Sequence, residues 1–169
     1  AKRTMRAAQQ LYEEGLITYM RTDSTSVSVG AIEATRALIT RQFGQEFLPS
    51  SPNRYLGKVK GAQEAHEAIR PTDVNRRPDS AGLTADANRL YSIIWQRLVA
   101  SQMPPARYLD QRAAISCAEA IFEAKGRKRL FAGFLAVYQE EREAESVLPA
   151  LSIGEELRFV DWQQERKFT

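Results

Sequence analysis

Residues 2–24 read KRTMRAAQQLYEEGLITYMRTDS and contain, in succession, a helix, a stop signal and a short extended segment. Apolar residues at helical spacing predict a helix over Lys2–Glu14, and Gly15 stands where a helix commonly ends. The partly β-branched segment Leu16–Arg21 predicts a short strand. Residues typical of turns and caps follow it: Thr22, Asp23, Ser24 and Thr25.

The same apolar periodicity predicts two further helices. The first runs from Ser28, a candidate N-cap, to Gly44, and the second begins after Thr84 and stops at Met103–Pro105. The sequence from Phe47 to Gly82 is broken by prolines and glycines, so we expect mostly ordered loop there.

The sequence changes character after Pro105. Cys117 falls in an apolar strand pattern, which predicts a core position. The expected fold class is α+β, with a helical domain over residues 1–105 and a β-rich segment over residues 106–169. Three segments predict the strands of the second part: Arg107–Ala118, Arg129–Tyr138 and Glu156–Trp162.

Composition limits the class of protein. The 169 residues are 43% hydrophobic and 27% charged, enough for one or two domains with a core. No apolar stretch approaches the ~18 residues of a membrane span, and a single cysteine excludes an intramolecular disulfide, which favours a cytoplasmic protein. Residues 1–109 hold 15 Lys and Arg against 10 Asp and Glu, and residues 110–169 hold 9 against 11. This asymmetry favours nucleic acid as the partner of the first part, and an ordinary solvated surface is the alternative.

Tyr19 and Arg21 form the first candidate site. The period of two in a strand would place both side chains on one face. A tyrosine oxygen can attack phosphorus, and the resulting ester is reversible without an external energy source, while a guanidinium neutralises phosphate charge during the attack. In the structural alternative, Tyr19 fills a pocket and Arg21 pairs with a carboxylate.

The second candidate site is the segment 63–72, QEAHEAIRPT, which contains the only histidine of the chain, His66. His66 and Glu67 begin the pattern of a zinc metalloprotease, but Arg70 occupies the position of the second histidine, so that hypothesis fails. If the segment is helical, His66 and Arg70 lie on one face and suit a phosphate or a proton-transfer role. A capping or loop histidine is the alternative. The sequence has no glycine-rich phosphate loop and no close acidic pair suited to magnesium, so no metal site is expected in this chain.

The two motifs, GLITYMRTDS at 15–24 and EAHEAIRPT at 64–72, together closely resemble bacterial type IA DNA topoisomerase I. The segments at 47–53, 90–95 and 102–106 are also similar to that family. The resemblance is firm over residues 1–109 and looser over 110–169.

The resemblance implies that Tyr19 attacks single-stranded DNA and forms a 5′-phosphotyrosyl intermediate with a free 3′-hydroxyl. It further implies that Arg21 contacts the scissile phosphate and that His66 assists cleavage through a hydrogen bond. DNA contacts are expected from the residues around them: Arg21, Thr22, Asp23, Ser24, His66 and Arg70. Passage of another strand and religation would then relax negatively supercoiled DNA.

The family fold is a toroid, and the resemblance assigns residues 1–105 to its active-site tyrosine domain, which is related to winged-helix DNA-binding domains. Residues 106–169 would be one half of the β-rich arch. The family binds Mg²⁺ through a Toprim domain that has no counterpart in this sequence. We therefore expect Mg²⁺ only in the full-length parent, none bound to this chain, and no DNA relaxation by this chain alone. The parent would be cytoplasmic and associated with the nucleoid.

Two other functions remain open on the sequence. A non-catalytic winged-helix-like DNA-binding module would bind through basic residues of its first helix, such as Lys2, Arg3 and Arg6. A structural interaction domain would show no salt-dependent DNA affinity at all. Replacement of Tyr19 separates the enzyme from the binding module, because only the enzyme would lose a covalent adduct.

Overall fold

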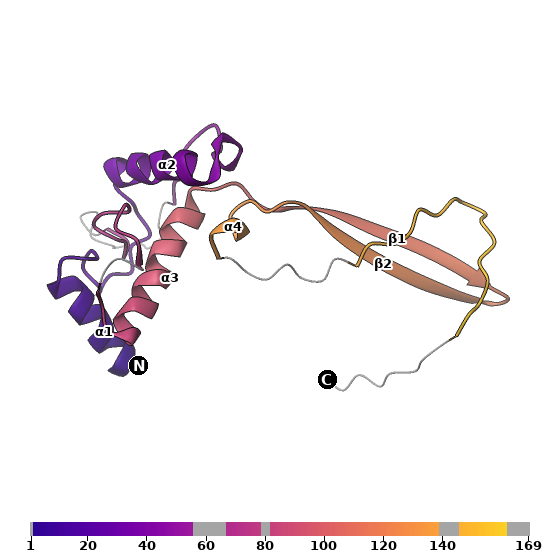
Figure 1. Ribbon diagram of the computed structural model, residues 1–169, viewed down its shortest axis with the longest axis horizontal. Helices are drawn as coiled ribbons and strands as arrows, with labels where there is room; N and C mark the ends of the chain where they lie inside the picture. Colours follow the sequence, from indigo (N-terminus) through magenta and orange to yellow (C-terminus); the bar gives the residue numbers. More distant parts are fainter. Residues whose placement is uncertain (1, 56–66, 79–81, 139–145, 162–169) are drawn as a thin grey trace. The chain divides into compact units, whose positions relative to one another are not determined.

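The computed structural model of the chain describes residues 2–55, 67–78, 82–138 and 146–161. It divides into two compact units. The first unit comprises Ala1–Arg107 and Arg129–Glu143, and the second comprises Tyr108–Lys128 and Ala144–Thr169. The described elements are helices and one two-stranded sheet, so the predicted α+β class is confirmed (Figure 1).

Helix α3, Ala85–Ser101, is the central element of the first unit (Figure 1). It packs against both α1, Lys2–Glu13, and α2, Val29–Phe43. A short 3-10 helix, η1, follows α2 at Gln45–Phe47. All three predicted helices are therefore confirmed, with ends close to those expected from the apolar periodicity.

Two clusters of buried side chains form the core of this unit, one along each half of α3. Tyr91 and Trp95 also anchor a loop, since the Tyr91 hydroxyl donates to the Arg76 carbonyl at 2.8 Å and Trp95 Nε1 donates to the Val74 carbonyl at 2.7 Å. The first cluster comprises Ala8, Leu11, Leu16, Ile17, Met20, Ala87 and Tyr91. The second comprises Leu38, Ile39, Val74, Trp95, Leu98, Val99, Met103 and Val137.

Gly15 ends α1 as predicted. Its φ of +69° lies in the left-handed region that glycine adopts without strain. The Gly15 amide donates to the Tyr12 carbonyl at 2.9 Å, and the Leu16 amide donates to the Leu11 carbonyl at 2.8 Å. These two bonds form a Schellman motif, which turns the chain sharply into the segment that carries Tyr19.

The strand predicted for Leu16–Arg21 is wrong. Only Ile17 pairs as in a sheet, in an isolated antiparallel bridge to Pro71, and the residues after it form no strand. The Arg70 amide donates to the Thr18 hydroxyl, at 2.9 Å, and not to the Thr18 carbonyl. The pairing therefore ends after the single bridge at Ile17.

The second predicted strand, Arg129–Tyr138, is also wrong in its bounds. Strand β2 runs over Ala120–Phe131 and is followed by a single helical turn, α4, Leu135–Tyr138. Gly133 lies between them with φ +51°, and a β-carbon there would lie 2.5 Å from the Pro104 carbonyl oxygen. The Phe134 amide donates to that carbonyl at 2.9 Å, so the chain turns at Gly133 beside Pro104.

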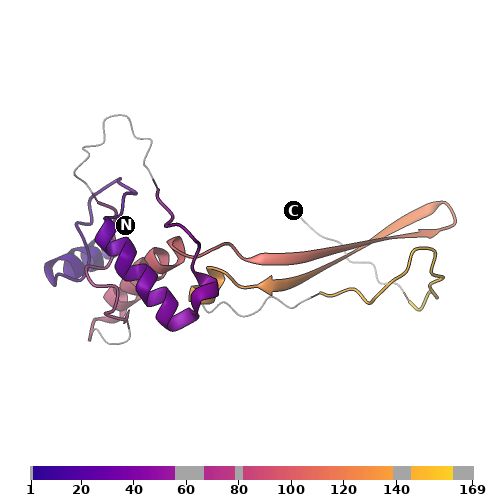
Figure 2. The same cartoon turned by 90° about the horizontal axis from the view of Figure 1, so that it is seen from above.

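Strand β1, Arg107–Cys117, confirms the first predicted strand. It forms a hairpin with β2 through a two-residue turn at Ala118, and Figure 2 shows the strands twisting about each other. Most of this hairpin belongs to the second unit, in which Ser146 bridges to Arg127.

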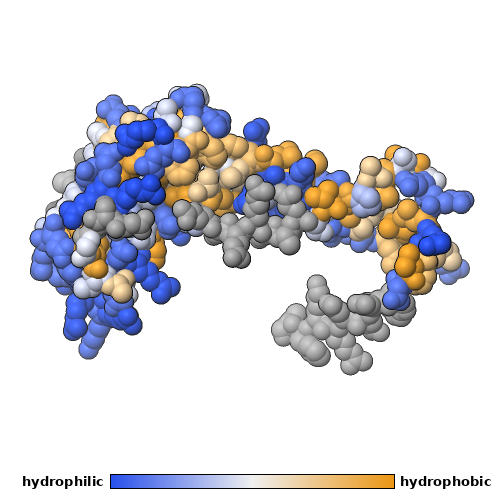
Figure 3. All heavy atoms as spheres, in the orientation of Figure 1, coloured by the Kyte–Doolittle hydropathy of each residue, from blue (hydrophilic) through white to orange (hydrophobic). Residues whose placement is uncertain are grey.

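Two expectations for the second unit are wrong. Cys117 is exposed rather than part of a core. Residues 156–161 form no strand, because no described strand pairs with their backbone, and Phe159 is 74% exposed. Trp162 lies outside the described residues. The hairpin itself also exposes large hydrophobic side chains, among them Ile121 and Phe122, and Figure 3 shows hydrophobic residues on its surface.

Candidate active site

The Tyr19 motif and the second motif meet through backbone pairing. The Thr18 amide donates to the Arg70 carbonyl at 2.9 Å, and the Thr72 amide donates to the Leu16 carbonyl at 3.0 Å. These bonds flank the bridge between Ile17 and Pro71. Pro71 is suited to this position because it needs no amide proton there. The structure thus joins the two segments that the sequence singled out separately.

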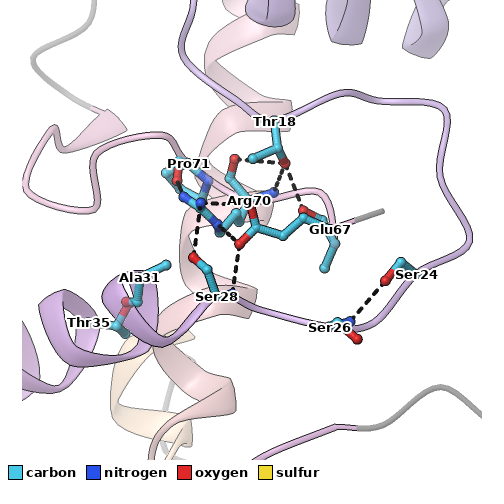
Figure 4. Close-up of polar contacts among 10 residues, drawn as sticks. Thr18, Ser24, Ser26, Ser28, Ala31, Thr35, Glu67, Arg70 and Pro71 are labelled. Carbon is cyan, nitrogen blue, oxygen red and sulfur yellow. Dashed lines mark hydrogen bonds and ion pairs between the residues drawn. The ribbon is translucent and has the colours of Figure 1, made fainter. Parts of the chain in front are cut away.

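The Thr18 side chain adds two further bonds across the same junction (Figure 4). Its hydroxyl donates to the Ala68 carbonyl at 2.7 Å and accepts a hydrogen bond from the Arg70 amide at 2.9 Å. The residue immediately before Tyr19 is therefore bound to the segment immediately after His66.

Tyr19 is 47% exposed, and its ring meets the edge of the Tyr12 ring at a centroid distance of 5.3 Å and an interplanar angle of 70°. Met20, the next residue, is buried in the core. Arg21 is exposed and makes no ion pair or hydrogen bond with any residue that the structure describes. The phenol and the guanidinium are thus both open to a ligand, and the pocket-filling and ion-pairing alternatives are not seen in the described residues.

The loop after Arg21 is stabilised by its own hydroxyls. The Ser24 amide donates to the Thr22 hydroxyl at 3.1 Å, and the Ser26 amide donates to the Ser24 hydroxyl at 3.2 Å. Asp23 is exposed between them. The Ser26 carbonyl in turn accepts from the Ala68 amide at 2.8 Å, which closes the loop onto the second motif.

This loop lines a groove of about 890 Å³ in the first unit. Residues 53–55 and the end of α3 also line the groove. Arg54 and Arg97 line it and are exposed. Tyr55 lines it too, and its hydroxyl donates to the Ser101 carbonyl at 3.0 Å. Such a combination of cations, hydroxyls and an aromatic ring suits a nucleic-acid strand.

Arg70 is bound within the protein (Figure 4). Its Nε lies 2.7 Å from Glu67 Oε1 and its Nη2 lies 2.8 Å from Glu67 Oε2, and the Arg70 side chain is 14% exposed. Glu67 Oε1 also accepts from the Ser28 amide at the start of α2, at 2.7 Å. A DNA phosphate would have to compete with Glu67 for this guanidinium.

The pKa of the Glu67 carboxyl reflects this environment. Partial burial acts to raise the pKa, but the hydrogen bonds from Arg70 and Ser28 outweigh it, so the pKa lies below its ordinary value. Glu67 is therefore ionised at neutral pH, and its negative charge interacts favourably with the positive N-terminal end of the α2 dipole.

His66 lies outside the described residues. Residues 67–70 are not helical, so the condition under which His66 and Arg70 would share a helical face is not met in the described part of this segment. Pro71 and the pairing of Arg70 with Thr18 both favour an extended backbone there.

Sequence reasoning missed the roles of three residues of this site: Tyr12, Thr18 and Glu67. The partners of Thr18 lie some fifty positions away, and no local pattern points to them. The spacing of three between Glu67 and Arg70 was a possible signal for an ion pair.

The described residues hold no group of three or more His, Cys, Asp and Glu side chains that could bind a metal ion. They also contain no helix long and apolar enough to cross a membrane.

Comparisons with known proteins identify the family of the chain. A family model described as DNA topoisomerase matches residues 1–169. DNA topoisomerase 1 of Vibrio cholerae is 45% identical over 170 residues, which cover 99% of this chain and 19% of that protein. DNA topoisomerase 1 of Streptomyces coelicolor is 50% identical over 146 residues, which cover 83% of this chain and 15% of that protein.

A solved structure shares the fold. Full-length topoisomerase I from Thermotoga maritima matches with a TM-score of 0.72 and 39% identity, over 89% of this chain and 25% of that one. The chain spans about a fifth of the length of the Vibrio relative. The match over all 169 residues and the high identity show that the chain belongs to the DNA topoisomerase family represented by the bacterial DNA topoisomerase 1 proteins.

Proposed function

We propose that this chain supplies the nucleophile of a type IA DNA topoisomerase. The observation that carries the proposal is Tyr19, a half-exposed phenol on a backbone segment held by hydrogen bonds to the second motif, in a chain of this family. The substrate is single-stranded DNA within negatively supercoiled DNA, and the activity belongs to the whole parent protein.

In the proposed reaction, the Tyr19 oxygen attacks the phosphorus of a phosphodiester. The bond from phosphorus to the 3′ oxygen breaks as the bond to Tyr19 forms, the phenol loses its proton and the 3′ oxygen gains one. The DNA is then joined to Tyr19 through its 5′ phosphate. Attack by the 3′-hydroxyl reverses these steps after a second strand has passed, so no energy source is consumed.

Arg21 and His66 act on the phosphate in this proposal. The exposed guanidinium of Arg21 offsets charge on the nonbridging oxygens, and His66 donates a hydrogen bond near the scissile phosphate. Thr22, Asp23 and Ser24 lie in the groove next to Arg21 and would contact the DNA beside the break. The Arg70 pairing with Glu67 favours a positioning role over a direct phosphate contact.

We infer that Mg²⁺ would be bound by other parts of the parent protein. The described residues do not fit a metal ion, because no cluster of three acidic, histidine or cysteine side chains exists among them. We derive no step through Mg²⁺ in this chain and expect the Toprim domain of the parent to bind it. The chain alone is accordingly expected to bind single-stranded DNA without relaxing a plasmid.

A hybrid protein tests the proposal. The chain replaces its matching segment in the Vibrio cholerae DNA topoisomerase 1, and the hybrid is mixed with labelled single-stranded DNA and Mg²⁺. We expect a covalent adduct on a denaturing gel. Tyr19→Phe should abolish the adduct and leave DNA affinity nearly unchanged. Tyr108→Phe, which removes a hydroxyl in the second unit, should still form the adduct.

Two results would contradict the proposal. One is an adduct that persists in Tyr19→Phe. The other is a hybrid that is folded by thermal melting and binds DNA but forms no adduct, which is the outcome expected of a non-catalytic DNA-binding module.

A further inference from the structure

The pairing between residues 16–18 and residues 70–72 has an irregularity at Thr18. In an antiparallel pair, facing residues alternate between those that exchange two backbone hydrogen bonds and those that exchange none. Ile17 and Pro71 are a pair of the second kind, because the bonds on either side of them join their neighbours. Thr18 and Arg70 should therefore exchange two backbone bonds.

Only one of these two bonds is made by backbone alone. The Thr18 amide donates to the Arg70 carbonyl at 2.9 Å, as expected. The return bond from the Arg70 amide goes to the Thr18 hydroxyl, also at 2.9 Å, in place of the Thr18 carbonyl. The hydroxyl then donates its own proton to the Ala68 carbonyl at 2.7 Å (Figure 4).

This substitution ends the ladder one residue before Tyr19. Because the Thr18 carbonyl is released from the pairing, the backbone can leave the strand direction at Tyr19. Met20 is buried in the core, 8% exposed, while Tyr19 is 47% exposed. The backbone of Tyr19 is thus held on one side by Thr18 and on the other by Met20, and the two partners of the hydroxyl belong to residues that follow His66 closely.

We propose that Thr18 is a positioning residue for the Tyr19 nucleophile. Its hydroxyl holds the tyrosine-bearing segment in a single register against the segment after His66. The proposal rests on the proposed function of Tyr19. Serine retains both hydrogen bonds and should preserve the role, whereas valine keeps the shape of threonine and removes both bonds.

The hybrid described above provides the test, with Thr18→Val, Thr18→Ser and Thr40→Val compared. Thr40 is an exposed residue of α2 whose hydroxyl bonds within its own helix, so it is a matched control for loss of a hydroxyl. We expect Thr18→Val to slow adduct formation by on the order of 100-fold, as misplacement of a reacting group does, with the Kd for single-stranded DNA unchanged. Thr18→Ser should restore the rate to within about threefold of the parent, and Thr40→Val should match the parent.

Amide hydrogen exchange on the 169-residue chain tests the contact without the hybrid. Thr18→Val should increase exchange at the Arg70 amide. The Asn88 amide is an internal control, because it donates to the Thr84 carbonyl at the start of α3 and involves neither Thr18 nor its partners. Unchanged protection at Arg70, an unchanged adduct rate in Thr18→Val, or a Thr18→Ser variant as slow as Thr18→Val would each overturn the proposal. An adduct that survives Tyr19→Phe would instead overturn the proposed function.

Discussion

Arg70 contacts both carboxylate oxygens of Glu67, with Nε 2.7 Å from Oε1 and Nη2 2.8 Å from Oε2. The pair is mostly shielded, since the side chains are 14% and 28% exposed. Glu67 also accepts from the Ser28 amide at the start of α2. A charged pair of this kind connects the second motif to the helix that follows the Tyr19 loop.

Glu67→Gln should destabilise the first unit. The substitution leaves the shielded Arg70 guanidinium without its counter-charge, and we expect a loss of about 1–3 kcal/mol in the free energy of unfolding, measured in urea. Glu33→Gln, on the exposed face of α2, should change it by less than about 0.5 kcal/mol. Equal effects of the two substitutions would show that the pair contributes nothing.

The contribution of Glu67 should depend on pH. Its folded-state pKa is lowered below the ordinary value of 4.5, so the unfolded state binds the proton more readily. The stabilisation is therefore complete above pH 4.5 and is lost as the pH falls through the folded-state pKa. Urea titrations at pH 7 and pH 3 should show a smaller difference between the parent and Glu67→Gln at pH 3, and a larger difference there would contradict this assignment.

Tyr12 should couple energetically to Tyr19. Their rings meet edge to face at 5.3 Å, an arrangement that contributes about 0.5–1.5 kcal/mol beyond buried area. A double-mutant cycle with Tyr12→Leu and Tyr19→Leu measures this coupling from unfolding free energies. Tyr12→Phe keeps the ring and should show almost no loss. Additive single substitutions would mean that the rings do not stabilise each other.

Gly133 and Gly30 should respond oppositely to alanine. At Gly133 the φ of +51° and the Pro104 carbonyl 2.5 Å from a new β-carbon both oppose the substitution, so Gly133→Ala should destabilise by more than about 1 kcal/mol. Gly30 lies in α2 with open space around it, so Gly30→Ala should stabilise by about 0.4–1 kcal/mol. Thermal melting gives both signs, and a neutral Gly133→Ala would refute the described turn.

Arg97 should contribute to single-stranded DNA binding through the groove. Each phosphate contact adds to the dependence of affinity on salt, so Arg97→Gln should weaken binding and reduce the salt slope by about 1. Arg112→Gln, on β1 and outside the groove, is the matched control. Fluorescence anisotropy at several salt concentrations measures both slopes. Identical slopes for the two variants would remove the groove from the DNA path.

Local sequence patterns were sufficient for the helices and insufficient for most of the strands. Lys2–Glu13, Val29–Phe43 and Ala85–Ser101 each bury one stripe of side chains, and that stripe appears in the sequence at spacings of three and four. The alternating residues 156–161 look like a strand, but alternation gives no information about a partner for the backbone. The turn at Gly133 likewise depends on the distant Pro104 carbonyl.

The candidate site shows the same division. Sequence patterns alone were enough to predict the three helices, the stop at Gly15, and the two motifs whose resemblance pointed to the topoisomerase family. Folding was needed to bring the Thr18 hydroxyl to the Arg70 amide, where it replaces the Thr18 carbonyl as acceptor, and to pair Arg70 with Glu67. Helical periodicity is set by neighbours within one turn, whereas the bond between Thr18 and Arg70 joins residues 52 positions apart. Such a contact forms only when the intervening helix and loops have folded around it, so no short stretch of sequence can specify it.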